Sequence, residues 1–568
     1  MKKDAPLYEV RPISDLKDML EQSRRLYADQ TAFLVKDKRG EPYRAIPYSQ
    51  YAADVDALGT AFADLGLVGG RIAILGEARY EWYVTYLATV NGTGVVVPLD
   101  KELPVQEIRT LLQRSYADAV VYSSSKKPEI DKIRADNPGV RHFICMEEST
   151  HPDDLSIAHL LDRGRSLLAA GNRDFLDAKI DPETMSILLF TSGTTAASKA
   201  VMLSHHNLSA NLQGMCSMLY VGPEDVFLSV LPVHHTYECT CGFLCQIYRG
   251  ATIAQCEGLR YIVQNMQESK VTIMLVVPLM LELFHRNIMK KAKATPEAAK
   301  KFHFAIGLTR TLRKVGIDLR RKLFHAVHDS FGGSLKMLIS GGAAVDPNIM
   351  RDMQDLGIAC VQGYGLTECA PILALNRDVY YKNNSAGLPL PGVDVRIIDA
   401  DENGIGEIIG KGPNVMLGYY ENEEATAEAI VDGYFHTGDL GYIDEDGFVI
   451  ITGRKKNVIV TKNGKNIFPE EIEALLCRSP LISEALVSGS DSGDGDIEVV
   501  AEIFPDAEAV TARIGENPAP DALRALIQEE VTSVNHMLTT YKYIRRFTLR
   551  DTEFEKTTSK KIKRNYTQ

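Results

Sequence analysis

A polar loop with the composition of a phosphate-binding site lies between two apolar runs of the chain. The runs, 185–190 and 201–203, predict two short buried strands. Hydroxyl and backbone N–H groups can surround phosphate oxygens, glycine permits close backbone approach, and lysine supplies a positive charge. A polar turn is the plain alternative for such a loop. The residues that would hold phosphate are Thr191, Ser192, Gly193, Thr194, Thr195 and Lys199.

Further polar clusters follow at wide intervals along the chain. Glu368 is a hard oxygen donor suited to Mg²⁺ held on phosphates, and Asp439, expected in a turn between strands, could accept two ribose hydroxyls. Taken singly, each cluster also has the composition of an ordinary turn or a solvated chain end. Their number and order favour one composite site. The clusters are LPVHH with His234 and His235, QGYGLTE with Tyr364, Thr367 and Glu368, HTGDLG with Asp439, and the basic tail KTTSKKIKR at 556–564.

Strand and helix signals alternate on both sides of the loop. This alternation predicts right-handed crossovers and a parallel sheet, and Ser204 is the expected N-cap of a helix after the loop. Residues 1 to about 375 are therefore predicted to form a large α/β body with more than one sheet. The expected strands are 71–75, 95–97, 119–122, 226–230, 251–254 and 272–276, and the expected helices include 80–90 and 104–114.

The pattern changes near residue 385. Short strands joined by Gly, Pro and Asp turns predict a small β-rich subdomain at about 380–452. Beyond Gly453 the pattern predicts a compact α+β domain. We expect one domain over 1–455 and a second over 456–568. The elements expected in the second domain are helices 469–477 and 521–534 and strands 482–487 and 497–503.

Composition excludes several classes of protein. The 568-residue chain carries a net charge of −12, which argues against general binding to nucleic acid. No apolar segment of a signal peptide is visible at the N-terminus. Nine cysteines, an odd number without framework spacing, indicate a reducing compartment, and the spacings between Cys239 and Cys256 match no structural zinc site. The expected location is cytoplasmic.

One segment departs from the acidic character of the chain. Residues 286–322 hold twelve Lys and Arg against two acids, Glu297 and Asp318. A solvated helical hairpin is the plain interpretation. The sharper hypothesis is an electrostatic contact with anionic lipid or with a phosphate-bearing cofactor. The sequence therefore leaves open whether this segment makes peripheral contact with a membrane.

Together and in this order, the clusters resemble the motifs of the adenylate-forming superfamily of acyl-CoA synthetases, luciferases and peptide-synthetase adenylation domains. TSGTTAASKAVMLSH is similar to the family's TSGTTGxPKG loop. The resemblance covers essentially the whole chain. LPVHH, SGGAAVD, GYGLTE, YFHTGDLG, GRKKNVIV and KTTSKKIKR match further family motifs in the family's order. RRKLFHAVHDSFGG, HHTYE and NGKNIFPEEIE are most similar to bacterial long-chain fatty-acid–CoA ligases.

The resemblance implies a two-step reaction and a fold to match. A fatty carboxylate attacks the α-phosphate of ATP with Mg²⁺, giving acyl-adenylate and pyrophosphate, and the CoA thiol then attacks the adenylate. The implied fold is α/β, with a large multi-sheet body, a small β-rich subdomain and a mobile α+β C-terminal lid. The implied substrates are a fatty acid, ATP and CoA.

The resemblance also implies roles for single residues, carried over position by position. Thr191, Ser192, Gly193, Thr194, Thr195 and Lys199 would hold the β- and γ-phosphates, and Glu368, with Thr191, would carry Mg²⁺. Tyr364 would pack on adenine near Gly341, Gly342 and Ala343, Thr367 would reach the α-phosphate, and Asp439 would bind ribose beside Arg454. Lys561 would bridge the substrate carboxylate and the α-phosphate, Lys456 would be the hinge, Gly464 would face the CoA tunnel, and His235 would lie at the mouth of the acyl pocket.

The chain departs from the family pattern at four positions. Ala196, Ser198 and Ala200 replace Gly, Pro and Gly of the loop, and Lys560 replaces the glycine before the catalytic lysine. Lys561 is favoured over Lys560 because Ile562 and Arg564 then fall in register with the family's GKIxR. Two alternatives stay open: transfer of the acyl group to a carrier protein or another acceptor, and a non-catalytic homologue that binds nucleotide or acyl groups. Chain length of the acid and oligomeric state are not determined by the sequence.

Overall fold

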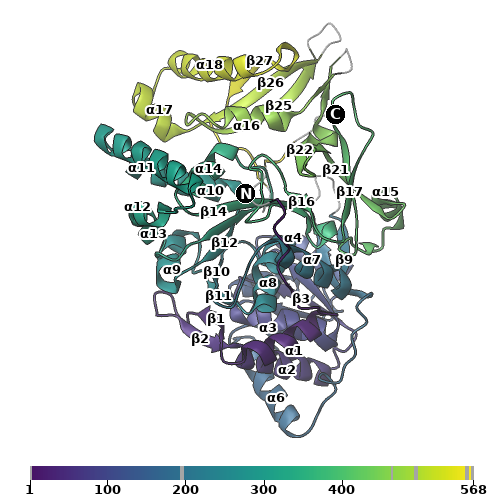
Figure 1. Cartoon of the computed structure of the whole chain (residues 1–568). Helices are drawn as coiled ribbons and strands as arrows, with labels where there is room; N and C mark the ends of the chain where they lie inside the picture. Colours follow the sequence, from purple (N-terminus) through teal and green to yellow (C-terminus); the bar gives the residue numbers. More distant parts are fainter. Residues whose placement is uncertain (1–2, 192–197, 462–464, 492–496, 557–561, 565–568) are drawn as a thin grey trace. The chain divides into compact units, whose positions relative to one another are not determined.

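The computed structural model describes residues 3–191, 198–461, 465–491, 497–556 and 562–564 (Figure 1). The chain forms two compact units, each described here by itself. The first holds the described residues up to 394, together with 411–435. The second holds 395–410 and the described residues from 436 onward. The segment 395–410 therefore leaves the first unit and the chain returns to it at 411.

An eight-stranded sheet of the first unit carries the polar loop. Its order is β19-β9-β8-β4-β3-β5-β6-β7, and the six strands from β8 to β7 in this order run parallel. β8 and β9 pair antiparallel, from Met185 with Ser204 to Phe190 with Ala200. The strands are β3 (Arg71–Leu75), β4 (Val95–Leu99), β5 (Ala119–Tyr122), β6 (His142–Cys145), β7 (Leu155–Ser156), β8 (Met185–Phe190), β9 (Ala200–Ser204) and β19 (Gly418–Tyr419).

A nine-stranded sheet completes the framework of the first unit. Its order is β16-β15-β14-β13-β12-β10-β11-β1-β2, with a parallel centre and antiparallel edges. The predicted α/β body with more than one sheet is thus confirmed. The strands are β1 (Thr31–Val35), β2 (Arg44–Pro47), β10 (Val226–Ser229), β11 (Thr252–Gln255), β12 (Ile273–Val276), β13 (Met337–Ser340), β14 (Ala359–Gly365), β15 (Ile372–Leu375) and β16 (Leu388–Pro389).

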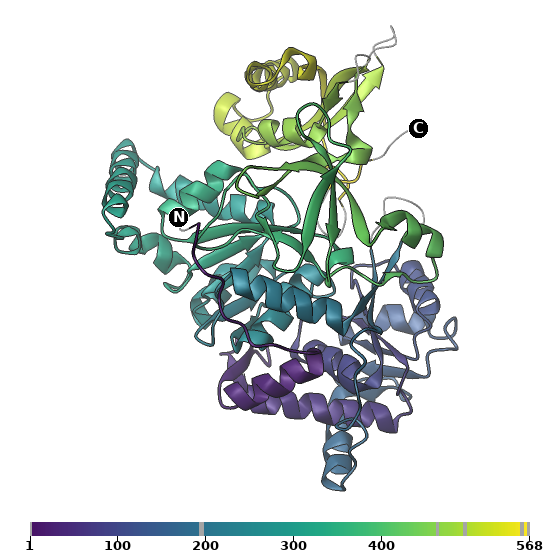
Figure 2. The same cartoon turned by 45° about the vertical axis from the view of Figure 1, so that its right-hand side comes forward.

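Helices flank these sheets, and most pack an apolar stripe onto apolar strands that are buried on both faces, as expected for parallel sheets (Figures 1 and 2). The α-helices are α1 (Leu16–Tyr27), α2 (Tyr48–Asp64), α3 (Tyr80–Ala88), α4 (Val105–Arg114), α5 (Lys127–Ile133), α6 (Ile157–Ala169), α7 (His205–Met218), α8 (Cys245–Arg249), α9 (Ile262–Ser269), α10 (Pro278–Ala292), α11 (Pro296–Lys314), α12 (Arg320–Leu323), α13 (His325–Ser330), α14 (Pro347–Asp355) and α15 (Glu423–Ala429). Two segments are π-helical, Thr89–Thr93 and Tyr237–Leu244.

The helix after the polar loop begins where the sequence predicted. The Ser204 side chain accepts from the Asn207 amide, and the Asn207 side chain accepts from the Ser204 amide, which makes a reciprocal capping box at the start of α7. The buried ring of His205 accepts from the Leu16 amide at Nδ1, so its Nε2 carries the proton and donates to the Val90 carbonyl. Burial lowers the pKa of His205, which keeps the ring neutral.

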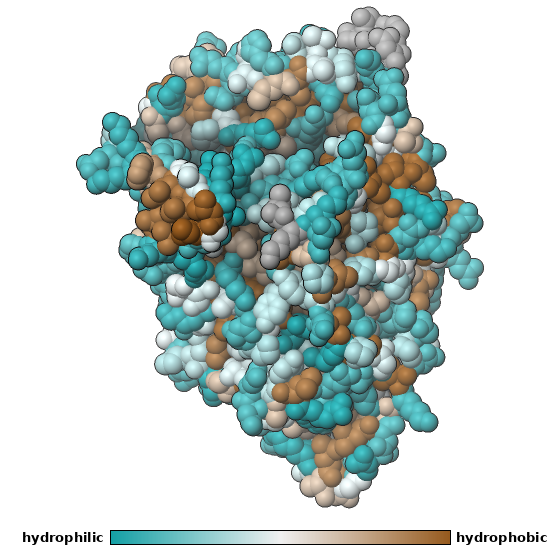
Figure 3. All heavy atoms as spheres, in the orientation of Figure 1, coloured by the Kyte–Doolittle hydropathy of each residue, from teal (hydrophilic) through white to brown (hydrophobic). Residues whose placement is uncertain are grey.

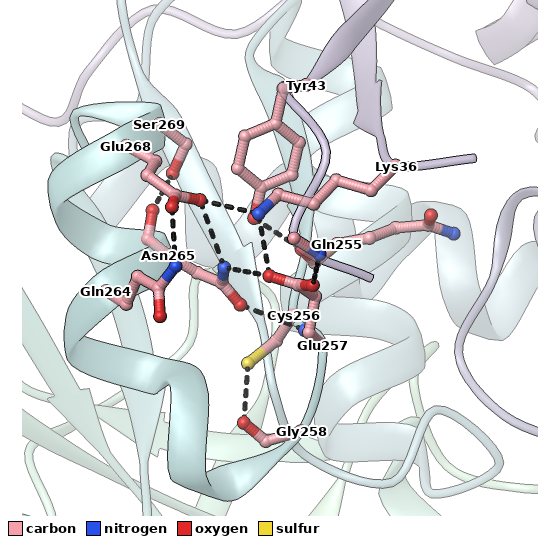
Figure 4. A network of polar contacts seen from close by, with 11 residues as sticks. Lys36, Tyr43, Gln255, Cys256, Glu257, Gly258, Gln264, Asn265, Glu268 and Ser269 are labelled. Atoms are coloured by element: carbon pink, nitrogen blue, oxygen red, sulfur yellow. Dashed lines mark hydrogen bonds and ion pairs between the residues drawn. The ribbon is translucent and has the colours of Figure 1, made fainter. Parts of the chain in front are cut away.

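A partly buried ion-pair network fixes the β1–β2 edge to α9 (Figure 4). The Lys36 ammonium lies 2.6 Å from a carboxylate oxygen of Glu257 and 2.6 Å from one of Glu268. Asn265 also donates to Glu257. Burial opposes ionisation of Glu257, but the hydrogen bonds from Lys36 and Asn265 outweigh it and hold the pKa at about 2. Because the network is fully paired within the first unit, we assign it a structural role.

The second unit combines most of a β-rich sheet with an α+β layer. The β-rich sheet contains β17 (Asp394–Ile398), β18 (Gly406–Lys411), β20 (Ile430–Val431), β21 (Tyr434–Ile443) and β22 (Val449–Arg454). The predicted C-terminal α+β fold is confirmed, with a core of apolar side chains between its sheet and helices. Its elements are β23 (Ile459–Val460), β24 (Asn466–Ile467), α16 (Pro469–Leu476), β25 (Ile482–Asp491), β26 (Ile497–Pro505), α17 (Ala507–Ile514), α18 (Pro520–Met537) and β27 (Ile544–Leu549).

In the part of the chain that the structure describes, no helix has both the length and the apolar character needed to cross a bilayer.

Candidate functional site

The two ends of the polar loop are held together by the β8–β9 hairpin. The Thr191 amide donates to the Lys199 carbonyl over 2.9 Å. Arg114 of α4 donates to the carbonyl of Ser198, and its guanidinium lies over the Phe190 ring. The hairpin therefore closes the loop at a fixed point of the sheet. Ser192, Gly193, Thr194 and Thr195, predicted to hold phosphate, lie outside the described residues.

One tyrosine connects the loop lysine to the predicted metal ligand. The Lys199 ammonium lies 4.5 Å from the centre of the Tyr419 ring, and the Tyr419 hydroxyl donates to Glu368 Oε1 over 2.9 Å. Burial, together with the neighbouring Glu368 carboxylate, raises the pKa of Tyr419, so its hydroxyl keeps its proton and stays a donor. Lys199 and Glu368 are 169 positions apart in sequence but lie on either side of this side chain.

Tyr419 reaches this position through a strand pairing. β19 pairs antiparallel with β9, so that Tyr419 faces Val201, two residues after Lys199. The sequence analysis missed Tyr419 because it lies in NVMLGYY, between two recognisable clusters, and a two-residue strand leaves no periodic signal. Arg114 was missed for a similar reason, since it appears in sequence as an ordinary basic residue at a helix end.

The GYGLTE cluster occupies the end of β14 and the turn that follows. Tyr364 is buried in β14, and Thr367 and Glu368 lie in a 3₁₀ turn. A Cβ on Gly365 would lie 1.9 Å from the Pro371 carbonyl oxygen, so only glycine fits there. The Met416 amide donates to the Glu368 carbonyl over 2.8 Å, which fixes the backbone behind the carboxylate.

Gly341, Gly342 and Ala343 follow β13, the parallel neighbour of β14. Gly342 has φ +88°, a left-handed conformation that glycine adopts without strain. A Cβ on Gly341 would lie 2.8 Å from the Tyr237 ring, so the backbone passes close to that side chain. Because parallel strands present their carboxyl ends at one edge, the structure brings Gly341–Ala343, Tyr364 and the turn with Glu368 to the same edge of the nine-stranded sheet.

The two histidines of LPVHH follow β10 at this edge. Their rings lie 4.2 Å apart. His234 is almost fully buried, and its Nε2 lies 3.6 Å from a carboxylate oxygen of Asp100, too far for a hydrogen bond. Burial, with the nearby His235, lowers the pKa of His234 well below its usual value, so His234 is neutral at pH 7. The His235 amide donates a hydrogen bond to the Pro232 carbonyl over 3.1 Å.

A buried carboxyl group lies one helical turn beyond these histidines. Glu238, in the π-helix, accepts from the Ser229 hydroxyl over 2.5 Å, and the Tyr83 hydroxyl lies 2.9 Å from the same oxygen of Ser229. Burial raises the pKa of Glu238 to about 8. The side chain is therefore uncharged at pH 7, and both its carboxyl group and the Phe227 ring lie close to Gly242.

The predicted turn at Asp439 is wrong, because Asp439 lies inside the strand β21. Residues 435–441 alternate between buried and more exposed positions, which is strand periodicity, although the sequence HTGDLG resembles a turn. Arg454 of β22 is directly opposite, with its Nε 2.9 Å from the Asp439 carboxylate. Asp439 is buried and Arg454 half-buried, so their predicted proximity is observed in the second unit.

The remaining predicted residues belong to the second unit or lie outside the description. Lys456 lies in a 3₁₀ turn just after β22, and burial and the charge of Arg454 lower its pKa. Gly464 and Lys561 lie outside the described residues. Next to Lys561, Ile562 pairs with Lys556, and Arg564 donates two hydrogen bonds to Glu473 of 2.6 and 2.7 Å.

The residues of the first unit suit a nucleotide phosphate with Mg²⁺. Among the described side chains, Tyr419 alone donates to the Glu368 carboxylate, and it does so at Oε1. The other carboxylate oxygen of Glu368 can therefore serve as a hard ligand. Thr191 offers a hydroxyl and Lys199 an exposed ammonium nearby. Among the described residues there is no group of three or more His, Cys, Asp and Glu arranged to hold a metal by themselves. This donor set fits a cation held mainly by substrate phosphates.

Comparison with known proteins identifies the family. Residues 20–420 match the AMP-binding enzyme family, and residues 456–568 match the AMP-binding enzyme C-terminal domain. The chain belongs to this family. It is an AMP-binding, adenylate-forming acyl-CoA ligase, and ATP, Mg²⁺ and CoA, as predicted, are the cofactors and co-substrate of the class.

Several relatives and solved structures resemble the chain over most of its length. A long-chain-fatty-acid–CoA ligase of Escherichia coli O6:H1 is 30% identical over 525 residues, 85% of each chain. The long-chain-fatty-acid–CoA ligase FadD15 of Mycobacterium tuberculosis is 29% identical over 553 residues, 91% of this chain and 89% of the relative. The crystal structure of an anthranilate CoA ligase with anthranoyl-AMP has a TM-score of 0.75 at 21% identity, over 99% and 97% of the two chains.

The contacts of Tyr419 generate a prediction for catalysis. In Tyr419→Phe the ring beneath Lys199 remains, but Glu368 loses its donor. We expect the Mg²⁺ concentration for half-maximal ATP–pyrophosphate exchange to rise and kcat/KM to fall about tenfold, the effect of one lost hydrogen bond to a charged group. The matched control is Tyr420→Phe, since the ring of Tyr420 contacts Arg71 instead. Equal behaviour of the two variants would contradict the role of the hydroxyl.

The buried Glu238 generates a prediction for stability. Above its usual pKa the unfolded chain releases this proton while the folded protein keeps it, so the free energy of unfolding falls as pH rises toward 8, by at most about 1.4 kcal/mol per pH unit. In Glu238→Gln this decline disappears. Denaturant unfolding is measured at pH 5.5, 7 and 8.5. Between the lowest and the highest pH, the free energy of unfolding of the variant should rise relative to that of the native protein by about 1–3 kcal/mol. Glu41→Gln, at an exposed site, is the control, and parallel pH profiles for Glu238→Gln and the native protein would contradict the assignment.

Proposed function

We propose that the enzyme activates a long-chain fatty acid to its acyl-adenylate and transfers the acyl group to CoA. The observation that carries the adenylation step is the placement of Lys199 and Glu368 on either side of Tyr419, at the end of the hydroxyl-rich loop. The names of the relatives at about 30% identity support a long-chain fatty acid as the substrate.

The proposed roles in the first unit follow from residue type and place. Thr191, Lys199 and the loop between them hold the β- and γ-phosphates, which become the leaving group, and positive charge there stabilises its departure. Glu368 and Thr191 hold the Mg²⁺, which when bound neutralises phosphate charge. The edge with Tyr364, Thr367 and Gly341–Ala343 receives adenine and the α-phosphate.

The second unit contributes the proposed ribose and carboxylate contacts. Asp439 accepts the ribose hydroxyls, and its ion pair with Arg454 holds the carboxylate in place. Lys561 aligns the fatty carboxylate with the α-phosphate, two anions that otherwise repel. Rotation of the domain from Lys456 onward, over 456–568, would withdraw Lys561 and present Gly464 to CoA before the thioester forms.

The acyl chain is proposed to enter beside His235. The neighbouring His234 is neutral and Glu238 is protonated at pH 7, so neither of these two side chains presents a charge to a hydrocarbon chain. A cytoplasmic, reducing location is proposed as well. All nine cysteines are free thiols, including Cys216 and Cys245, whose sulfur atoms share a hydrogen bond over 3.5 Å and no disulfide.

The decisive test of the function is pyrophosphate release across fatty acids of two to twenty carbons, with and without CoA. We expect release to peak with long chains and acyl-CoA with AMP to accumulate only when CoA is present. A peak with short or aromatic acids would overturn the long-chain assignment. Release with thioester formation only on a carrier protein would overturn the choice of CoA. Fatty-acid binding without release would indicate a non-catalytic homologue.

The role of Lys561 predicts a difference between the two half-reactions. In Lys561→Ala we expect adenylation to fall by a factor of about 100 or more, because the two anions lose their bridging charge, while thioester formation from supplied acyl-adenylate stays within about threefold. Lys560→Ala is the matched control and should leave both steps nearly unchanged. Equal losses in both half-reactions would contradict the role of Lys561.

A further inference from the structure

The helix α11 has an apolar face that does not contact the core. Its inner face packs Phe302, Ala305 and Ile306 on the core cluster around β12 and β13. The outer face carries Phe304 and Leu308, and Val315 follows at the C-cap, with 72, 38 and 71% of their surfaces exposed. Intervals of four and seven residues place all three on one side of the helix. We call these three side chains the α11 ridge.

Lysines border the α11 ridge on both sides. Lys300 and Lys314 lie at helical spacing along one border, and Lys301 lies along the other, all three exposed. Figure 3 shows a group of hydrophobic side chains, surrounded by hydrophilic ones, on the surface where Figure 1 draws α11 and α12. An apolar ridge bordered by long cationic side chains is typical of a helix that lies in the interface of a membrane.

The structure separates the cations of 286–322 into two groups. Arg310 is paired with Asp355, Arg320 pairs with Asp318 and also donates to the Gln354 carbonyl, and Arg321 donates to the carbonyls of Gly333 and Leu335. These arginines hold the segment to the body of the first unit. Lys291, Lys293, Lys300, Lys314 and Lys322 are exposed. The segment keeps a charge of +10 in a chain of net charge −12, so an anionic surface would attract this face and repel most of the others.

We propose that the α11 ridge and its bordering lysines dock on the surface of an anionic lipid bilayer. Phe304, Leu308 and Val315 enter the headgroup boundary, and the lysine ammonium groups reach the phosphates. A soluble polyanion would satisfy the lysines but leave the ridge in water. A solvated hairpin would leave both without a partner. Of these three, bilayer docking uses the two features together.

Docking extends the proposed function, and its benefit to the enzyme rests on that function. Long-chain fatty acids reside largely in bilayers, so an enzyme held at the surface by α11 draws its substrate from the lipid phase. The binding itself does not depend on that function, because the α11 ridge lies outside the residues assigned to ATP, Mg²⁺ and CoA. Vesicle binding and acid activation are therefore measured separately.

The test is sedimentation of the full chain with vesicles of phosphatidylcholine alone or of phosphatidylcholine with about 30% phosphatidylglycerol, an anionic lipid. We expect binding only to the anionic vesicles, and its loss in 0.5 M salt, because salt screens the lysines. Lys300→Gln with Lys314→Gln should lower the partition coefficient about tenfold or more. Phe304→Ser with Val315→Ser should lower it by a similar factor even at low salt.

Matched controls change the same residue types elsewhere on the first unit. Lys38→Gln with Lys132→Gln alters two exposed lysines, and Val68→Ser with Leu259→Ser alters two apolar side chains exposed by 64 and 68%. Both control pairs should bind vesicles as the native chain does.

Three outcomes would overturn the proposal. The first is equal binding by the ridge variants and the controls. The second is loss of binding in the lysine pair alone, which would indicate a purely electrostatic site. The third is a native dimer that the ridge variants dissociate, which would assign the ridge to a second copy of the chain. Fatty acid delivered in detergent should be activated equally by the native enzyme and all these variants. Failure of activation in the native enzyme would count against the proposed function and leave the vesicle result standing.

Discussion

The pairing of two short strands determines the geometry on which the candidate site depends. β19 is only two residues long, yet its contact with β9 places the Tyr419 ring beneath Lys199 and the Tyr419 hydroxyl on Glu368. The lysine comes directly before one strand of a hairpin, and the glutamate lies in a turn that follows a strand of the other sheet. Without the tyrosine, each would be a flexible side chain on its own backbone. The strand pairing converts them into parts of one rigid arrangement, which is the condition for stabilising charge that develops during a reaction.

A second constraint is the low charge of the region beyond β10. His234 and Glu238 are both titratable, and burial keeps both uncharged near pH 7. Glu238 accepts a hydrogen bond from the Ser229 hydroxyl, which in turn contacts the Tyr83 hydroxyl. The phosphate side of the first unit, with the exposed Lys199 and the half-buried Glu368, has the opposite character. The same unit thus offers one region to an anionic group and another to a hydrocarbon chain.

Sequence patterns predicted the parts of this arrangement that arise from local physics. The strand 185–190, the cap at Ser204 and the helix at 469–477 follow from periodicity and capping, and the structure has all three nearly as expected. Tyr419 and Arg114 could not be predicted, because their importance lies in partners far along the chain. Asp439 was placed in a turn because Gly-Asp pairs usually mark turns, whereas pairing with β22 keeps it in a strand. The ion pairs of Arg310 and Arg320 likewise could not be separated from the exposed lysines by composition alone.

The late position of β19 in the chain has a consequence for biosynthesis. β9 ends at Ser204, and its partner at 418–419 leaves the ribosome more than two hundred residues later. At about 5–20 residues per second, that interval lasts roughly 10–40 s. During it, β9 presents unpaired amides and carbonyls along an open edge, the feature that invites pairing with another nascent chain. Factors that shield hydrophobic or unpaired segments on polysomes would therefore be needed most between the appearance of β9 and that of β19.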